Sequence, residues 1–151
     1  MTVKALLAAL TPWLGACDGV TISGGEPFDQ PAALARLVQG VRNLGVGDVM
    51  LYSGYMIEAL RRDHPEILEC CAALVDGEFR QGDESDAVWK GSGNQRLHVL
   101  TADPAVRQRY ERYAGEAVAR PRVQVVGKNR TVYVIGIPRQ RDAERIVHGT
   151  G

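Results

Sequence analysis

The chain has 151 residues and equal numbers of acidic and basic side chains, so its formal charge at neutral pH is zero. Its hydrophobic content of 45% and charged content of 24% are typical of a soluble globular domain and argue against a disordered chain. No apolar run approaches the ~20 residues of a membrane helix, and no clean signal-peptide cleavage site follows the first helix. Three cysteines with an adjacent pair do not suit a disulfide framework, which favours a cytoplasmic location.

The charge is unevenly distributed along the chain. Residues 1–103 contain 8 Lys and Arg against 14 Asp and Glu, whereas residues 104–151 contain 10 against 4, so the two parts carry −6 and +6. The basic part could contact nucleic acid or an acidic protein. We favour the simpler interpretation of a solvated helix face and a charged tail, and nucleic-acid binding is not expected.

Periodicity predicts helices that alternate with short strands over the first part of the chain. The expected helices and strands, in chain order, are 2–14 (helix), 20–23 (strand), 31–45 (helix), 48–53 (strand), 56–63 (helix), 66–74 (one or two helical turns) and 74–77 (strand). A polar loop over 79–93 then leads to a strand at 94–101 and a helix at 103–118, with Asp103 as its cap. Two alternating β runs flank Gly127, Lys128 and Asn129, which predicts a hairpin.

These elements predict an α/β fold with a mainly parallel sheet, flanking helices and a C-terminal β-hairpin. We expect a single domain over residues 1–138, in which 103–138 form a helix-plus-hairpin extension, and a flexible tail over 139–151.

Two glycine turns follow the first two predicted strands, SGGEP at 23–27 and SGY at 53–55. Because ligands gather at the carboxyl ends of parallel strands, these turns predict a binding site. The first turn lacks the spacing of a phosphate-binding loop, and Glu26 would repel a phosphate. Its carbonyls and carboxylate suit an ammonium group instead. A tight turn with a solvated Glu26 remains equally open.

Four segments resemble the radical S-adenosylmethionine enzymes, and within them the activating proteins of anaerobic ribonucleoside-triphosphate reductase. They are the GGEP motif within 22–28, LYSGY at 51–55, LVDGEF at 74–79 and WKGSGNQR at 89–96. The resemblance implies a partial (β/α) barrel, bound S-adenosylmethionine and a 4Fe-4S cluster held by three cysteines. It also implies reductive cleavage of S-adenosylmethionine and abstraction of a hydrogen atom from a glycine of a partner enzyme.

The resemblance and the turns together suggest a set of cofactor-binding residues. These are Ser23, Gly24, Gly25, Glu26, Pro27, Ser53, Tyr55, Asn94 and Arg96. Asn94 and Arg96 supply donors for ribose or carboxylate oxygens, although a role in holding the loop together is equally open. No residue is assigned a catalytic role.

The C-x-x-x-C-x-x-C motif that the resemblance implies is absent before the GGEP motif, where Cys17 is the sole thiol. Cys70 and Cys71 are adjacent on a predicted helix and do not suit a cluster, so no metal ligand is assigned. Two interpretations follow. The chain is an incomplete activating enzyme, inactive alone, or it is a non-enzymatic module that binds S-adenosylmethionine or a partner.

Overall fold

The computed structural model describes residues 1–117, 123–128 and 131–136, the last two ranges as backbone only. The chain divides into two compact units, Met1–Glu116 and Ala117–Gly151. The predicted tail, 139–151, lies outside the described residues, and the predicted domain boundary at 138 stays a prediction. No helix among the described residues is long and apolar enough to cross a membrane.

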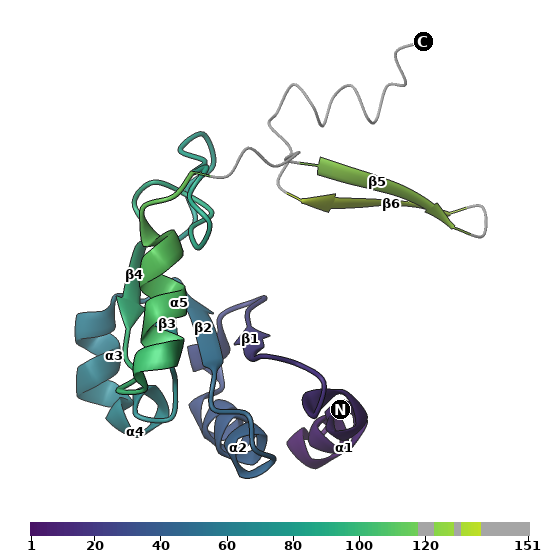
Figure 1. Cartoon of the computed structure of the whole chain (residues 1–151), viewed down its shortest axis with the longest axis vertical. Coiled ribbons are helices and arrows are strands. Elements are labelled where there is room, and N and C mark those ends of the chain that lie inside the picture. Colours follow the sequence, from purple (N-terminus) through teal and green to yellow (C-terminus); the bar gives the residue numbers. More distant parts are fainter. Residues whose placement is uncertain (118–122, 129–130, 137–151) are drawn as a thin grey trace. The chain divides into compact units, whose positions relative to one another are not determined.

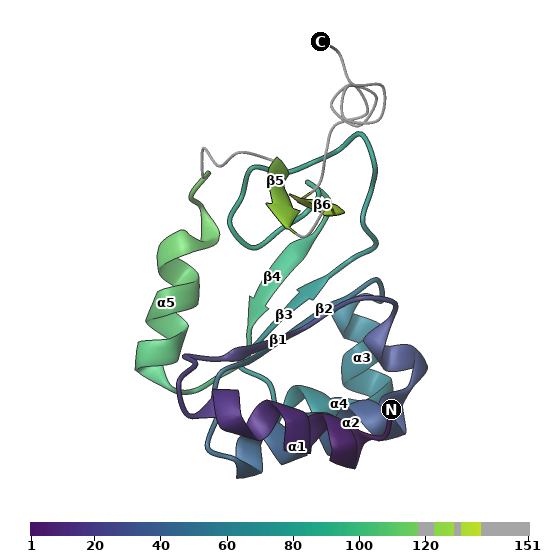
Figure 2. The ribbon, with the colours of Figure 1, turned by 90° about the vertical axis from the view of Figure 1, so that its right-hand side faces the viewer.

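A four-stranded sheet forms the centre of the first unit, in the order β1-β2-β3-β4 (Figures 1 and 2). Its strands are β1 (Val20–Ile22), β2 (Val49–Ser53), β3 (Ala73–Asp76) and β4 (Arg96–Val99). The first three strands are parallel, and β4 runs antiparallel to β3. This arrangement confirms the predicted α/β fold with a mainly parallel sheet.

Helices cover both faces of this sheet, with one group on each face. The elements between or before the parallel strands are α1 (Val3–Leu14), the 3₁₀ turn η1 (Pro27–Asp29), α2 (Pro31–Asn43), α3 (Ile57–Asp63) and α4 (Pro65–Leu68). Helix α5 (Pro104–Ala114) follows β4 and lies across the sheet from α1 and α2, as Figure 2 shows.

Alternation along the strands produces two hydrophobic layers. Val49, Leu51 and Leu74 pack with apolar side chains of α1 to α4, whereas Met50 and Val75 pack with α5. Successive side chains of a strand point to opposite faces, so a short apolar strand such as β2 can be buried on both. The short continuous apolar run at 48–53 therefore corresponds to a central strand.

Helix α2 shows how the sequence pattern becomes packing. Leu34, Val38 and Val41 recur at helical spacing, and all three are buried against the sheet. Pro31 at the first helical position fixes the backbone for the helix, and Gly45 follows its end with a φ of 92°.

One predicted helix is shorter than expected. The helical turns predicted over 66–74 end at Leu68, and Ala73 and Leu74 belong to β3. The Ala72 N–H donates to the Val49 carbonyl, so this segment pairs with β2 and does not continue the helix. Cys70 and Cys71 consequently lie between α4 and β3 and not on a helix.

The second unit contains an antiparallel strand pair, β5 (Val123–Lys128) and β6 (Thr131–Gly136). This pair confirms that two antiparallel strands follow one another here, as predicted. The predicted place of the turn is wrong for Gly127 and Lys128, because both belong to β5 and pair with Val132 and Thr131 of β6; Asn129 lies outside the described residues.

Candidate functional site

The first glycine turn leaves β1 with a backbone that only glycine adopts readily. Gly24 has a φ of 88° and Gly25 a φ of 54°, both in the left-handed region. A Cβ placed on either residue would meet no atom within 4 Å. The glycines are therefore required by backbone conformation, and the outer side of the turn is open.

Glu26 fastens this turn to the turn that follows β2. Its Oε1 accepts from the Phe28 N–H at 3.0 Å and from the Ser53 hydroxyl at 2.9 Å, and its Oε2 accepts from the Gly54 N–H at 2.7 Å. The two turns thus lie side by side at the carboxyl edge of the sheet, as the parallel arrangement predicts. The Glu26 carboxylate is held by the protein and keeps further lone pairs for a ligand.

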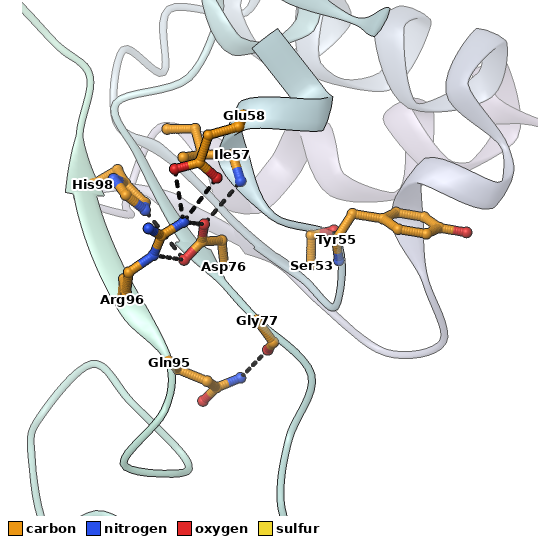
Figure 3. Close-up of polar contacts among 9 residues, drawn as sticks. All are labelled: Ser53, Tyr55, Ile57, Glu58, Asp76, Gly77, Gln95, Arg96 and His98. Atoms are coloured by element: carbon orange, nitrogen blue, oxygen red, sulfur yellow. Dashed lines mark hydrogen bonds and ion pairs between the residues drawn. The ribbon is translucent and has the colours of Figure 1, made fainter. Parts of the chain in front are cut away.

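Tyr55 extends from the second turn toward η1. Its hydroxyl donates to Asp29 Oδ1 at 3.0 Å, and its N–H donates to the Ser53 hydroxyl at 3.0 Å. The Asp29 carboxylate that accepts this hydrogen bond raises the pKa of Tyr55. In Figure 3 the Tyr55 ring points away from Asp76.

A cavity of about 260 Å³ adjoins the first turn. Ser23, Gly24 and Pro27 line its polar side, and apolar side chains at the beginning of α1 and along α2 line the rest, among them Leu6 and Leu37. The turn is therefore not filled by its own side chains. A ligand with a polar head and an apolar part could contact both sides of this cavity.

Asp76 organises the other half of the same edge. Its side chain is fully buried, and its oxygens accept from Arg96 Nε at 3.0 Å, from Arg96 Nη2 at 2.6 Å and from the Ile57 N–H at 2.8 Å (Figure 3). Arg96 Nη2 also donates to Glu58, at 3.0 Å. The carboxylate thus joins β3, β4 and the first turn of α3.

The charged form of Asp76 is favoured despite its burial. Burial alone raises the pKa of the carboxyl, but hydrogen bonds from Arg96 and from the Ile57 N–H, together with the nearby His98 side chain, lower it by more, so the pKa of Asp76 lies below its usual value. His98 Nε2 lies 3.1 Å from Asp76 Oδ1, within ion-pair distance, but it forms no hydrogen bond with a group in the described part of the chain.

Asn94 and Gln95 hold the polar loop against the end of β3. The Asn94 amide donates to the Glu78 carbonyl at 2.9 Å, and its oxygen accepts from the Ser92 hydroxyl at 2.8 Å. The Gln95 amide donates to the Gly77 carbonyl at 2.9 Å. Of the two roles open for Asn94, these contacts support the structural one.

The structure therefore separates the predicted site residues into two groups. Residues 23–27, Ser53 and Tyr55 gather around Glu26, whereas Asn94 and Arg96 lie near the end of β3 and bond to protein groups. Ser53 pairs in register with Asp76, and Asp76 with Arg96, so both groups share one edge. Asp76 is not among the residues predicted from the sequence. The sequence feature that could have indicated it is an acid directly before a glycine at the end of a strand.

The cysteines do not form a cluster site. Cys17 is exposed, Cys71 is buried, and their thiols donate to separate carbonyls, those of Leu14 and Ile67. Burial is the main cause that raises the pKa of Cys71 to about 12, which opposes the thiolate that a metal needs. Within the described residues, no group of three or more His, Cys, Asp or Glu side chains could hold a metal. A 4Fe-4S cluster does not fit the residues present.

Comparison with known proteins gives a consistent set of relatives. The anaerobic ribonucleoside-triphosphate reductase-activating protein of Escherichia coli is 31% identical over 87 residues, covering 55% of this chain and 56% of the relative. The Salmonella typhimurium protein is 34% identical over 88 residues, with the same coverage, 55% and 56%. The Enterobacteria phage T4 protein is 29% identical over 99 residues, covering 64% and 61%.

The chain spans 56% of the length of the first of these relatives. No solved structure matches it. The profile of the family described as "4Fe-4S single cluster domain" matches residues 4–98, which include β1, β2, β3, most of β4 and both glycine turns. The chain therefore belongs to the 4Fe-4S single cluster domain family.

Proposed function

We propose that this chain carries the S-adenosylmethionine-binding turn of a radical S-adenosylmethionine activating protein. The observation that carries the proposal is the open left-handed turn at Gly24 and Gly25, fastened by Glu26 to the next turn beside a cavity. The carbonyls of this turn and the remaining lone pairs of Glu26 accept from the ammonium group of the ligand. Ser53 orients the carboxylate for this contact.

The remaining predicted residues have supporting roles in this proposal. Ser23 and Pro27 border the cavity, and Tyr55 covers η1. Arg96 keeps 41% of its side chain exposed, so it can also meet a ligand carboxylate at the same edge. Asn94 acts indirectly, because both ends of its amide are already bonded to the loop.

The names of the relatives support the proposed partner, and the cysteines support the proposed cytoplasmic location. Their shared name states that they activate anaerobic ribonucleoside-triphosphate reductase. We extend this to a glycyl-radical-type enzyme as the partner of the present chain. Its cysteines are all free, in keeping with a reducing cytoplasm.

Reductive cleavage of S-adenosylmethionine by these 151 residues alone is not part of the proposal. It requires an electron from a 4Fe-4S cluster, and the described residues contain no group of three or more His, Cys, Asp or Glu side chains that could hold a metal, since Cys17 lies far in sequence from the adjacent Cys70 and Cys71. This arrangement favours a second candidate, a non-enzymatic module that binds S-adenosylmethionine or a partner protein. Iron and sulfide analysis of anaerobically purified chain separates the two, because a full complement of both would exclude the module.

Calorimetric titration with S-adenosylmethionine tests the binding turn. The Glu26→Gln variant removes the charge that faces the ligand amine, and we expect its affinity to fall roughly 10-fold, the size of a lost charge-assisted hydrogen bond. Glu66→Gln, at an exposed position of α4, removes the same charge elsewhere and should bind like the wild type. Circular dichroism checks that both variants are folded. Equal affinity of the two folded variants would refute the site.

A further inference from the structure

A second cavity lies on the face of the sheet that α5 covers, and none of its lining residues belongs to either glycine turn. Its volume is about 550 Å³, within the range of small-molecule sites. Asp18 and Asp48, which precede β1 and β2, line one side, and residues of α5 and the loop before β4 line the other. All of its lining residues belong to the first unit.

Trp89 forms a rigid aromatic wall of this cavity. Its indole N–H donates to the Tyr110 carbonyl at 3.2 Å, and its own carbonyl accepts from the Tyr52 hydroxyl at 2.8 Å. The Trp89 ring lies 5.1 Å from the Tyr110 ring and 6.5 Å from the Tyr113 ring, measured between centroids. A planar ligand would therefore meet an aromatic platform that is already ordered.

The Asp48 carboxylate does not present a free negative charge to this cavity. It accepts from the Tyr110 hydroxyl at 2.5 Å and from Arg109 Nη2 at 3.0 Å, and only 14% of the Asp48 side chain is exposed. Burial and this carboxylate raise the pKa of Tyr110, so its hydroxyl remains a donor. The Asp48 carboxylate is consequently not an unpaired charge that would repel an anionic ligand.

Other polar groups at the cavity have no protein partner. Within residues 1–117, no hydrogen bond or ion pair engages the side chains of Asp18, Gln108 or Arg112. Arg112 stacks on the Tyr113 ring at 5.2 Å. Stacking holds the guanidinium in place and leaves its in-plane N–H groups available for an anion, which is the geometry that suits a phosphate.

We propose that this cavity binds a nucleoside polyphosphate. The base stacks on Trp89, Gln108 hydrogen-bonds its polar edge, and Arg112, held over the Tyr113 ring, binds the phosphates. Asp18 accepts from a ribose hydroxyl. This site is separate from the glycine turns and does not depend on the proposed binding of S-adenosylmethionine.

The fluorescence of Trp89 provides a direct test. A Trp13→Phe background removes the other tryptophan, which is 72% exposed on α1. Titration with ATP should then quench the remaining emission in a saturable manner. Arg112→Gln should weaken ATP binding roughly 10-fold, as expected for a lost charge-assisted hydrogen bond. Arg61→Gln removes an equal charge from exposed α3 and should leave the affinity unchanged.

Two further ligands identify the chemistry that is recognised. Adenosine should bind more weakly than ATP and with equal affinity to the Arg112→Gln and Arg61→Gln variants, because it lacks phosphate. S-adenosylmethionine, which carries the same base without phosphate, should not quench at concentrations where ATP saturates. Absence of quenching by ATP, or equal ATP affinity of the Arg112→Gln and Arg61→Gln variants, would overturn the proposal.

Discussion

The two halves of the carboxyl edge of the sheet use similar residues in different ways. Glu26 and Asp76 are both acids next to glycines where a strand ends, and both accept hydrogen bonds from neighbouring elements. Asp76 is buried and surrounded by Arg96, His98 and α3. Glu26 is half-buried and follows an open turn, and its neighbours Gly24 and Pro27 line a cavity. An acid at a strand end therefore indicates a binding site only when the backbone next to it stays accessible.

Substitution of Asp76 should have the largest effect on the free energy of unfolding. Asp76→Asn leaves Arg96 without its buried partner, and we expect it to lower the free energy of unfolding by about 3 kcal/mol, the lower part of the range for breaking a buried pair, because Arg96 stays partly exposed. Urea denaturation measures the change. Asp63→Asn breaks the exposed pair with Arg62 and should have little effect. A large loss in both variants would show that burial does not distinguish the two pairs.

Low pH should destabilise the folded chain through Asp76, in the same half of the edge. Because the pKa of Asp76 is lower in the folded chain than in the unfolded chain, its stabilising contribution is complete above the unfolded pKa of about 3.9 and is lost as the pH falls through the folded value. Urea denaturation at a series of pH values below about 5 should show this loss in the wild type. The Asp76→Asn variant should lack that part of the pH dependence.

A substitution in the first glycine turn should have the smallest effect on the free energy of unfolding. Gly24→Ala places a Cβ at a φ of 88° and should cost about 1–2 kcal/mol, although the space around it is open. Gly45→Ala, at a φ of 92° after α2, is a matched control with the same expected cost. Thermal denaturation should show similar losses, whereas calorimetry with S-adenosylmethionine should show weaker binding for Gly24→Ala alone. Equal binding by both variants would remove the turn from the proposed site.

Local rules in the sequence predicted much of the fold. Asp103 caps α5 through hydrogen bonds to the N–H groups of Ala105 and Val106, with Pro104 at the first helical position, as its spacing predicts. The apolar run at 48–53 became a central strand, and the two glycine turns met at one edge. Each of these features depends on residues close in sequence or on the parallel arrangement of neighbouring strands.

Contacts between residues far apart in the sequence were harder to predict. The end of α4 at Leu68 depends on pairing of the following residues with β2, which local helix propensity does not reveal. Arg96 is equally suited in sequence to a ligand carboxylate and to Asp76, and only the register of β3 and β4 places the two side chains together. The ligand contacts of Glu26 stay a prediction.

The position of Asp76 in the chain has a consequence for synthesis on the ribosome. Its carboxylate emerges 20 residues before Arg96 and 19 residues after Ile57. A nascent chain that ends before Arg96 must therefore keep the Asp76 carboxyl hydrated or protonated. The carboxylate can be buried at the end of β3 without a large cost only when β4 brings Arg96 beside it. Because β4 precedes α5 in the chain, the partner that neutralises Asp76 is synthesised before the helix that covers the other face of the sheet.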